Sequence, residues 1–334
     1  MGISIASVLL LFGLLLFGVT MLFTKGETNK AYIKFVFIVY PLMELSLNSK
    51  WGSFVLFDMI SIAFYIFFYQ SSKPISLKKL HLSTYIIFLC FIIAIGLINT
   101  SYFSLDSVKL LSHVLSSFVF VKTLLEIALA EYSFYFVVID HLVLSLKIAL
   151  VFLLLQIYIG VDFSFEKSGN VNVLSGNTIR YPGYFQDPQK FAQYLSALSF
   201  IVLIKAKDQL KLTWVNYTLL LLTLMAMLLT GGRAAFGGWF LGMGLLFVLA
   251  PSAYKSAIGS VGGIILLIAL NYSESIPMFN RSSTLADAFD FRWEIWKDAY
   301  QIFLKQPFVG IGLGAYATYV SIHQPDQYWE FEKE

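Results

Sequence analysis

The chain has 334 residues, of which 58% are hydrophobic and only 13% charged, with a mean hydropathy of +0.76 and a net charge of +3. A soluble domain of this length could not cover its surface with so few polar side chains, so the composition excludes one and indicates a polytopic membrane protein. The small charge predicts no nucleic-acid partner. Cys90 is the single cysteine, which excludes a disulfide within the chain and a cysteine-ligated metal site.

Apolar runs of roughly 20 residues, long enough to cross a bilayer as a helix, recur along the chain. They predict an all-α fold, a polytopic transmembrane bundle with about ten spans. The predicted spans are 3–23, 31–48, 51–70, 82–99, 108–130, 133–160, 188–204, 212–230, 234–250 and 255–271. The first lacks a basic n-region and a clear cleavage site, so we expect a retained span rather than a signal peptide.

Charged residues inside these spans are costly in hydrocarbon, which makes them functional candidates. They are Asp58, Lys122, Glu126, Asp140 and Lys147. Lys122 and Glu126 are four residues apart and can pair on one helix. The five charges either pair between helices or form a proton relay, and a relay would indicate a transporter.

Lysines cluster in the odd-numbered connections, around residues 25–34, 73–79, 205–211 and 255, which the positive-inside rule assigns to the cytoplasm. The even-numbered connections then lie outside. The predicted organisation is N-terminal transmembrane helices over 1–160, an extracytoplasmic loop over 161–187, transmembrane helices over 188–271, and an extracytoplasmic loop over 272–334.

All four arginines fall on this predicted outer face, where topology does not require them: Arg180, Arg233, Arg281 and Arg292. A guanidinium stays charged and presents a rigid fork that matches phosphate and carboxylate oxygens. The pattern indicates an outer site for a phosphorylated or acidic substrate.

Residues 290–305 are predicted to form an amphipathic helix at the bilayer surface. Trp293, Trp296, Tyr300 and Phe303 recur at three- and four-residue steps, which gives one aromatic face. Arg292 lies one turn before Trp296, so its guanidinium can cover the indole ring. The alternative is a simple interfacial anchor in which Arg292 contacts lipid phosphate.

Pro307 ends this helix, and Gly310, Gly312 and Gly314 follow at alternate positions. Closely spaced glycines can expose backbone amides to an anion. A tight turn of the chain toward the membrane is the equally good alternative.

Three motifs stand out in the second half of the chain. The first runs from Arg292-x-x-x-Trp296 to the glycine series and Tyr316. The second is Arg180-Tyr-Pro-Gly183, continuing to Asp187-Pro188 and Ala192, and the third is Thr230-Gly-Gly-Arg233. Together they resemble the O-antigen ligase and polymerase superfamily. The resemblance covers residues 180–323, whereas the first 160 residues match only in hydropathy.

The resemblance implies a metal-independent membrane glycosyltransferase with no cofactor, in the bacterial inner membrane, with its active site on the extracytoplasmic face. Its partners would be a polyprenyl-pyrophosphate-linked glycan, a glycan or lipid acceptor and the bilayer, with a flippase and a chain-length regulator as further candidates. Arg180, Arg292 and Arg233 match the pyrophosphate-binding positions, and Gly183, Trp296, Gly310, Gly312 and Gly314 match substrate-contacting loop positions. Arg281 matches no motif. The outer connection Asn48–Trp51 lacks the acidic pair of metal-dependent transferases.

A base must take the acceptor proton, and histidine suits neutral pH. Of His81, His113, His141 and His323, only His323 lies in the outer loop beyond the glycine turn. The family has His-Asn there, whereas Gln324 follows here. A His-Asn pair after Glu334, in a longer chain with the family's closing spans, is the alternative expectation. Asp287, Asp290 and Glu294 are further candidates.

Our first interpretation is a polymerase of polysaccharide repeat units, because polymerisation uses glycan as both donor and acceptor. The runner-up is an O-antigen ligase that joins glycan to lipid A core. A polysaccharide exporter or flippase is the alternative without glycosyltransferase activity.

Overall fold

The computed structural model describes residues 5–24, 26–40, 46–49, 52–70, 86–88, 90–91, 93–95, 105–161, 163, 179–185, 187–208, 213–249, 255, 258–260, 262–264, 267, 271–272, 285–307, 310–312 and 314–323. The chain divides into two compact units. The first comprises Met1–Leu9, Lys34–Glu44 and Tyr132–Ser282, and the second comprises Leu10–Ile33, Leu45–Glu131 and Ser283–Glu334.

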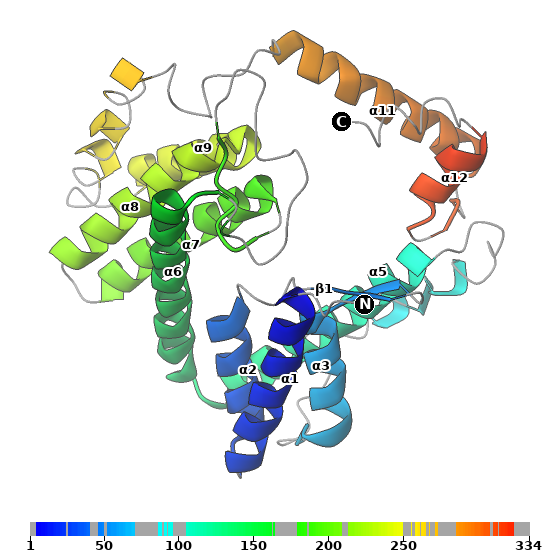
Figure 1. Ribbon diagram of the computed structural model, residues 1–334, viewed down its shortest axis with the longest axis horizontal. Coiled ribbons are helices and arrows are strands. Elements are labelled where there is room, and N and C mark those ends of the chain that lie inside the picture. The colour runs from blue at the N-terminus through cyan, green and yellow to red at the C-terminus, as the bar shows by residue number, and fades with distance from the viewer. Residues whose placement is uncertain are drawn as a thin grey trace. The chain divides into compact units, whose positions relative to one another are not determined.

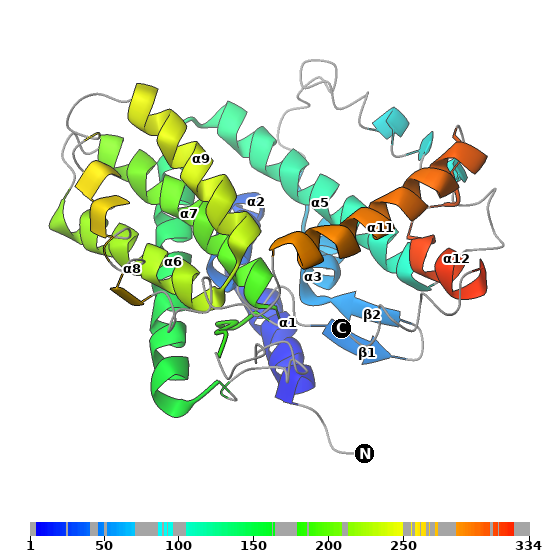
Figure 2. The ribbon, with the colours of Figure 1, turned by 90° about the horizontal axis from the view of Figure 1, so that it is seen from above.

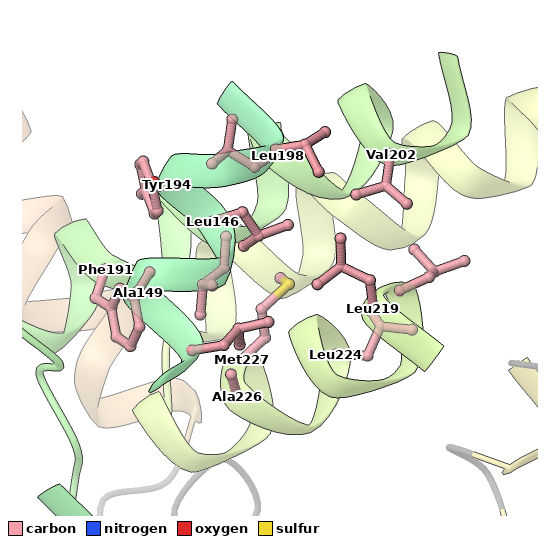
Figure 3. Packing of buried hydrophobic residues seen from close by; sticks show 14 of the residues in the cluster. Leu146, Ala149, Phe191, Tyr194, Leu198, Val202, Leu219, Leu224, Ala226 and Met227 are labelled. Carbon is pink, nitrogen blue, oxygen red and sulfur yellow. The ribbon is translucent and has the colours of Figure 1, made fainter. Parts of the chain in front are cut away.

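The first unit is built around four helices that follow one another along the chain (Figure 1). They are α6 (Phe134–Ile159), α7 (Pro188–Asp208), α8 (Trp214–Thr230) and α9 (Arg233–Leu249). Helix α7 contacts α6, α8 and α9, so it is the central helix of this unit. Figure 3 shows its side chains Leu198 and Val202 among apolar residues of α6 and α8.

Local sequence signals explain where these helices begin and end. Pro188 opens α7, a position where the missing N–H costs nothing. The Thr213 hydroxyl accepts a hydrogen bond of 3.3 Å from the Asn216 amide and caps the start of α8. Gly231, in the left-handed conformation at φ 68°, terminates α8. These bounds agree to within two residues with the predicted span 212–230.

Helices α7 and α9 approach each other through glycine. A Cβ atom at Gly232 would overlap the Cβ atom of Ala192, and one at Gly242 would lie 2.7 Å from the Phe200 ring. Lipid chains are as apolar as leucine, so close packing of small residues holds such helices together in a bilayer. These two positions therefore require glycine for packing.

The second unit contains α1 (Ile5–Phe23) from Leu10 on, the first residues of α2 (Thr28–Val39), strands β1 (Ser46–Ser49) and β2 (Gly52–Val55), α3 (Leu56–Phe67), α5 (Leu105–Ala130), α11 (Leu285–Lys305) and α12 (Tyr316–His323). Helix α3 packs against α5. Tyr32 of α2 stacks on Phe64 of α3, with ring centroids 4.0 Å apart. The Tyr32 hydroxyl donates a hydrogen bond of 2.8 Å to Ser61.

A network of ion pairs and hydrogen bonds connects one end of α2 to the ends of α3 and α5. Lys30 Nζ lies 2.6 Å from a carboxylate oxygen of Glu131 and 3.2 Å from one of Glu27. The Asn29 amide donates to the Gln70 carbonyl at 2.8 Å. The hydrogen bond to Glu131, and then that to Glu27, raises the pKa of Lys30. This network connects three segments that, according to the lysine distribution, are predicted to lie on the same side of the membrane.

The prediction of an all-α fold is confirmed in its main part and wrong at residues 46–55. Two helical spans, 31–48 and 51–70, were expected to meet there, but β1 and β2 form an antiparallel hairpin that leads directly into α3 (Figure 2). Hydropathy measures how apolar a segment is and takes no account of helix propensity. Asn48, Ser49 and Gly52 are poor helix formers. In a hairpin their backbone groups pair across the strands instead.

Two described helices are long and apolar enough to cross a membrane: Ser107–Ala130 and Phe134–Ile159. Shorter apolar helices lie within four more predicted spans, among them Leu56–Phe67 and Trp214–Thr230. The predicted spans 82–99 and 255–271 lie largely outside the described residues, and the count of ten stays a prediction. The predicted pair within α5 is confirmed, with Lys122 Nζ 3.3 Å from Glu126.

Candidate functional site

Arg180 is bound to the C-terminal end of α8. Its side chain is buried, with 3% exposed, and its Nε donates a hydrogen bond of 2.8 Å to the Thr230 carbonyl. The neighbouring Tyr181 amide donates to the Leu229 carbonyl at 3.3 Å. The last carbonyls of a helix lack partners within the helix and carry its negative dipole end, so a guanidinium is well suited to this place. Two of the three motifs therefore meet at one point.

Arg233 lies two glycines beyond the end of α8, where Arg180 binds the Thr230 carbonyl. Arg233 is the first residue of α9 and is half-buried. Its amide donates to the Gly231 carbonyl at 3.1 Å. The turn between α8 and α9 thus places the two guanidinium-bearing residues beside the same helix end.

Gly183 requires glycine for two reasons. Its φ of 61° lies in the left-handed region, and a Cβ atom there would lie 2.6 Å from the Phe191 ring. Gln156 clamps the same residue: the Gly183 amide donates to its Oε1 at 3.0 Å, and its Nε2 donates to the Gly183 carbonyl at 3.2 Å. The side chain of Gln156 is fully buried. The segment that bears Arg180 is therefore held at both Thr230 and Gln156.

Sequence reasoning missed Gln156. Its Nε2 also donates to the carbonyls of Val161 and Phe163, at 3.4 and 3.1 Å. It therefore joins the beginning of the 161–187 loop to the end of that loop. The signal that could have identified it is a single side-chain amide near the outer end of the predicted span 133–160.

Aromatic rings surround the Arg180 segment within the first unit. Tyr184 lies with its ring centroid 4.9 Å from Phe185 and 5.8 Å from Phe191. Burial raises the pKa of the Tyr184 phenol well above its ordinary value. This phenol therefore stays neutral far into alkaline pH and is no candidate for the base.

The third motif lies in the second unit. Helix α11 covers the predicted segment 290–305, and Gly310, Gly312 and Gly314 that follow it all have positive φ, at 64°, 104° and 69°. The glycine series thus needs glycine at each of its three positions. Ile302 of α11 packs against Tyr319 of α12.

The aromatic face of α11 is exposed. Trp293 and Trp296 are 57% and 56% exposed, and Tyr300 and Phe303 are exposed to a similar degree. This is the stripe that the periodicity predicts, and its location at the bilayer surface stays a prediction. Arg292 belongs to α11, but its side chain lies outside the described part of the structure.

His323 is the last residue of α12 and is exposed. Its Nδ1 lies 3.0 Å from the Tyr319 carbonyl, and its ring stacks on that of Tyr319 at 4.2 Å. A carbonyl can only accept, so Nδ1 carries the proton and Nε2 is the basic nitrogen. This geometry leaves His323 as a candidate base. No cluster that could hold a metal occurs among the described residues.

Comparison with known proteins covers the C-terminal third of the chain. Residues 218–333 match the family model of the O-antigen ligases. This part of the chain is similar to that family. The matching segment starts within α8 and includes the Thr230–Arg233 corner, α9, α11 and α12, whereas Arg180 and Gln156 precede it. No curated protein and no solved structure matches the chain.

The match confirms the resemblance to the O-antigen ligase and polymerase superfamily. With the apolar helices, it supports an integral membrane protein that functions as this family does. Arg180 and Arg233 lie in one compact unit, and Arg292 and His323 in the other. The structure brings together the segments that bear Arg180 and Arg233. That these two arginines form one site with Arg292 and His323 is a proposal.

Proposed function

We propose that this protein is a metal-independent glycosyltransferase that acts on polyprenyl-pyrophosphate-linked glycans at the outer face of the inner membrane. The first-choice reaction is polymerisation of polysaccharide repeat units. The observation that carries the proposal is the hydrogen bond from Arg180 to the end of α8, which unites two arginine-bearing motifs. The family of residues 218–333 supports the same reaction class.

In the proposed reaction, an acceptor hydroxyl attacks the anomeric carbon of the donor glycan. The bond from that carbon to the lipid pyrophosphate breaks, and the pyrophosphate leaves with the electron pair. Arg180, Arg292 and Arg233 stabilise the developing negative charge, as fixed guanidinium groups do without reorganisation. Histidine takes the acceptor proton, and the sequence nominates His323 for this step.

The remaining site positions have supporting roles in this proposal. Gly183, Gly310, Gly312 and Gly314 let the backbone turn through conformations that residues with side chains rarely adopt, and their positive φ values support that role. Trp296 lies on the aromatic face that would border the lipid tail of the donor.

Ligation of a glycan to lipid A core is the second candidate, and the description of the matching family favours it. The two reactions share donor, leaving group and arginines, and they differ only in the acceptor. Purified protein is incubated with lipid-linked repeat units alone and with lipid A core added. Longer glycans in the first reaction indicate a polymerase, and glycan on lipid A only in the second indicates a ligase. Unchanged glycans together with translocation in vesicles would indicate an exporter.

Replacement of Arg292 by lysine tests the guanidinium itself. Lysine keeps the charge but offers no fork, so we expect Arg292→Lys to lower turnover by about 10²- to 10³-fold. Arg281→Lys is the matched control, because Arg281 matches no motif, and it should retain turnover. Near-normal turnover of Arg292→Lys would refute the assignment.

Cysteine labelling in cells tests the outer location of the site. With Cys90 replaced by serine, a cysteine at Glu294, which is exposed on α11, should react with a membrane-impermeant maleimide added outside. A cysteine at Glu27, in the predicted cytoplasmic connection and 65% exposed in its side chain, should react only after permeabilisation. The reverse pattern would place the proposed chemistry on the wrong side of the membrane.

A further inference from the structure

A carboxylate–imidazole pair joins α3 to α5 in the second unit. Asp58, in the first turn of α3, is 1% exposed, and its Oδ1 lies 3.1 Å from Nδ1 of His113. The His113 side chain is 52% exposed. One end of the pair is thus deeply buried and the other reaches the surface of the unit.

The pair is held rigidly. The Phe57 ring meets the His113 ring edge-on, with centroids 5.7 Å apart. Phe57 also packs edge-on against Phe120, two turns further along α5. A carboxylate and an aromatic ring, both on α3, therefore orient the imidazole of His113 on α5, and α3 packs against α5.

The Asp58 carboxylate is incompletely satisfied within the described part of the structure. Its Oδ2 is buried and accepts no hydrogen bond there, and Ser116 Oγ on α5 is likewise buried without one. A buried negative charge is costly and is stabilised chiefly by a positive partner. The ring of His113, whose Nδ1 lies 3.1 Å from Oδ1, is the group that faces this carboxylate.

The two candidate imidazoles differ in this respect. His323 faces the neutral carbonyl of Tyr319, whereas His113 faces a carboxylate. In nucleophilic and acid–base sites, a buried carboxylate that binds one imidazole nitrogen fixes the tautomer and orients the other nitrogen toward the substrate. His113 has that arrangement with Asp58.

The predicted topology is compatible with an outer location. The hairpin before Asp58 and the connection before α5 are both predicted on the extracytoplasmic side. His113 is the ninth of the 26 residues of α5, in the half nearest that connection. The dyad therefore lies toward the side on which a lipid-linked donor is expected.

We propose that His113 is the general base of the transfer reaction and that Asp58 is its positioning residue. The inference rests on the proposed function. As the acceptor oxygen forms its bond to the anomeric carbon, its proton passes to Nε2 of His113. The carbon–oxygen bond to the lipid pyrophosphate breaks, and that leaving group keeps the electron pair. The imidazolium then releases its proton to water.

The test compares turnover in purified protein with lipid-linked repeat units. We expect His113→Ala to lower kcat by about 10²- to 10⁴-fold while KM for the donor stays within about twofold. Added imidazole should restore part of the kcat, because the site of the lost ring is half exposed. Asp58→Asn keeps the shape of the side chain but removes its charge, and it should lower kcat with little change in KM.

His141→Ala is the matched control. His141 is a histidine on α6 whose Nδ1 contacts the Val137 carbonyl of its own helix at 2.7 Å, and it forms no ion pair with a carboxylate among the described residues. This variant should retain the kcat of the unaltered protein. His323→Ala is measured beside it, and loss of turnover there with normal turnover in His113→Ala overturns the proposal.

Other outcomes are equally decisive. If His113→Ala fails to fold, His113→Gln keeps a side-chain amide that can donate to Asp58, and unaltered kcat in that variant overturns the proposal. A parallel loss of kcat and of donor binding in Asp58→Asn indicates a merely structural pair and also overturns it. If the unaltered protein transfers no glycan, the proposed function itself fails, which is a separate result.

Discussion

Replacement of Gln156 by leucine tests how the Arg180 segment is held. Leucine has nearly the same volume, so the change removes the hydrogen bonds of Gln156 and leaves little cavity. Three of these bonds are 3.2 Å or shorter: those with the carbonyls of Phe163 and Gly183, and the one from the Gly183 amide. The perturbation is therefore confined to one buried polar contact set.

The expected loss of stability follows from those bonds. Each contributes about 1 kcal/mol net, and a buried amide left without an acceptor costs about 1–3 kcal/mol more. We expect Gln156→Leu to lower the free energy of unfolding by about 4–6 kcal/mol. In a unit of this size, each kcal/mol corresponds to about 2–4 °C, so the unfolding temperature should fall by about 8–24 °C.

The assay is thermal unfolding in detergent, together with turnover on lipid-linked repeat units. Tyr158→Phe is the control, because Tyr158 is two residues away and 90% exposed, and it should leave both quantities unchanged. Turnover of Gln156→Leu should also fall, since Arg180 loses one of its two anchors. An unfolding temperature within about 2 °C of that of the unaltered protein would be a smaller change than the loss of one hydrogen bond produces. It would show that the hydrogen bonds of Gln156 contribute no stability, and it would refute the reasoning.

Two further predictions concern packing and pH. Gly232→Ala should lower the unfolding free energy by about 1–3 kcal/mol because its methyl group would overlap Ala192. Gly237→Ala, five residues further on in α9, has open space and should be neutral or stabilising in the same thermal assay. Burial, and then the charge of Asp298, raises the pKa of Tyr316 above its unfolded value of 10.0. The stability that this raised pKa contributes is fully present below pH 10 and is lost as pH rises through the folded pKa. The unfolding temperature of Tyr316→Phe should therefore fall less between about pH 9 and 11 than that of the unaltered protein. Equal slopes of unfolding temperature against pH would contradict this prediction.

Local signals were sufficient for several elements. The span predicted at 212–230 is α8 because its Thr213 cap and its Gly231 terminator lie next to the helix that they bound. Lys122 and Glu126 pair because a separation of four residues places them on one helix face. The three glycines after Pro307 adopt positive φ, as residues without a side chain readily do.

Hydropathy alone was insufficient at residues 46–55. It predicted two helices that meet at a short connection, whereas the chain forms a hairpin before α3. A hydropathy average weighs how apolar a segment is, and it carries no information about how the backbone satisfies its hydrogen bonds. Short polar stretches such as this one escape it.

The sequence by itself determined the membrane class, the arginine-bearing motifs and the helices whose caps are local. Only the tertiary structure decided that Arg180 binds Thr230, that Gln156 clamps Gly183, and that Asp58 faces His113. These partners are 27 to 55 residues apart. Helical periodicity tells which residues share a face of one helix. The close packing of small residues and the pairing of buried polar groups decide which helix packs against that face, and these interactions act between elements rather than along the chain.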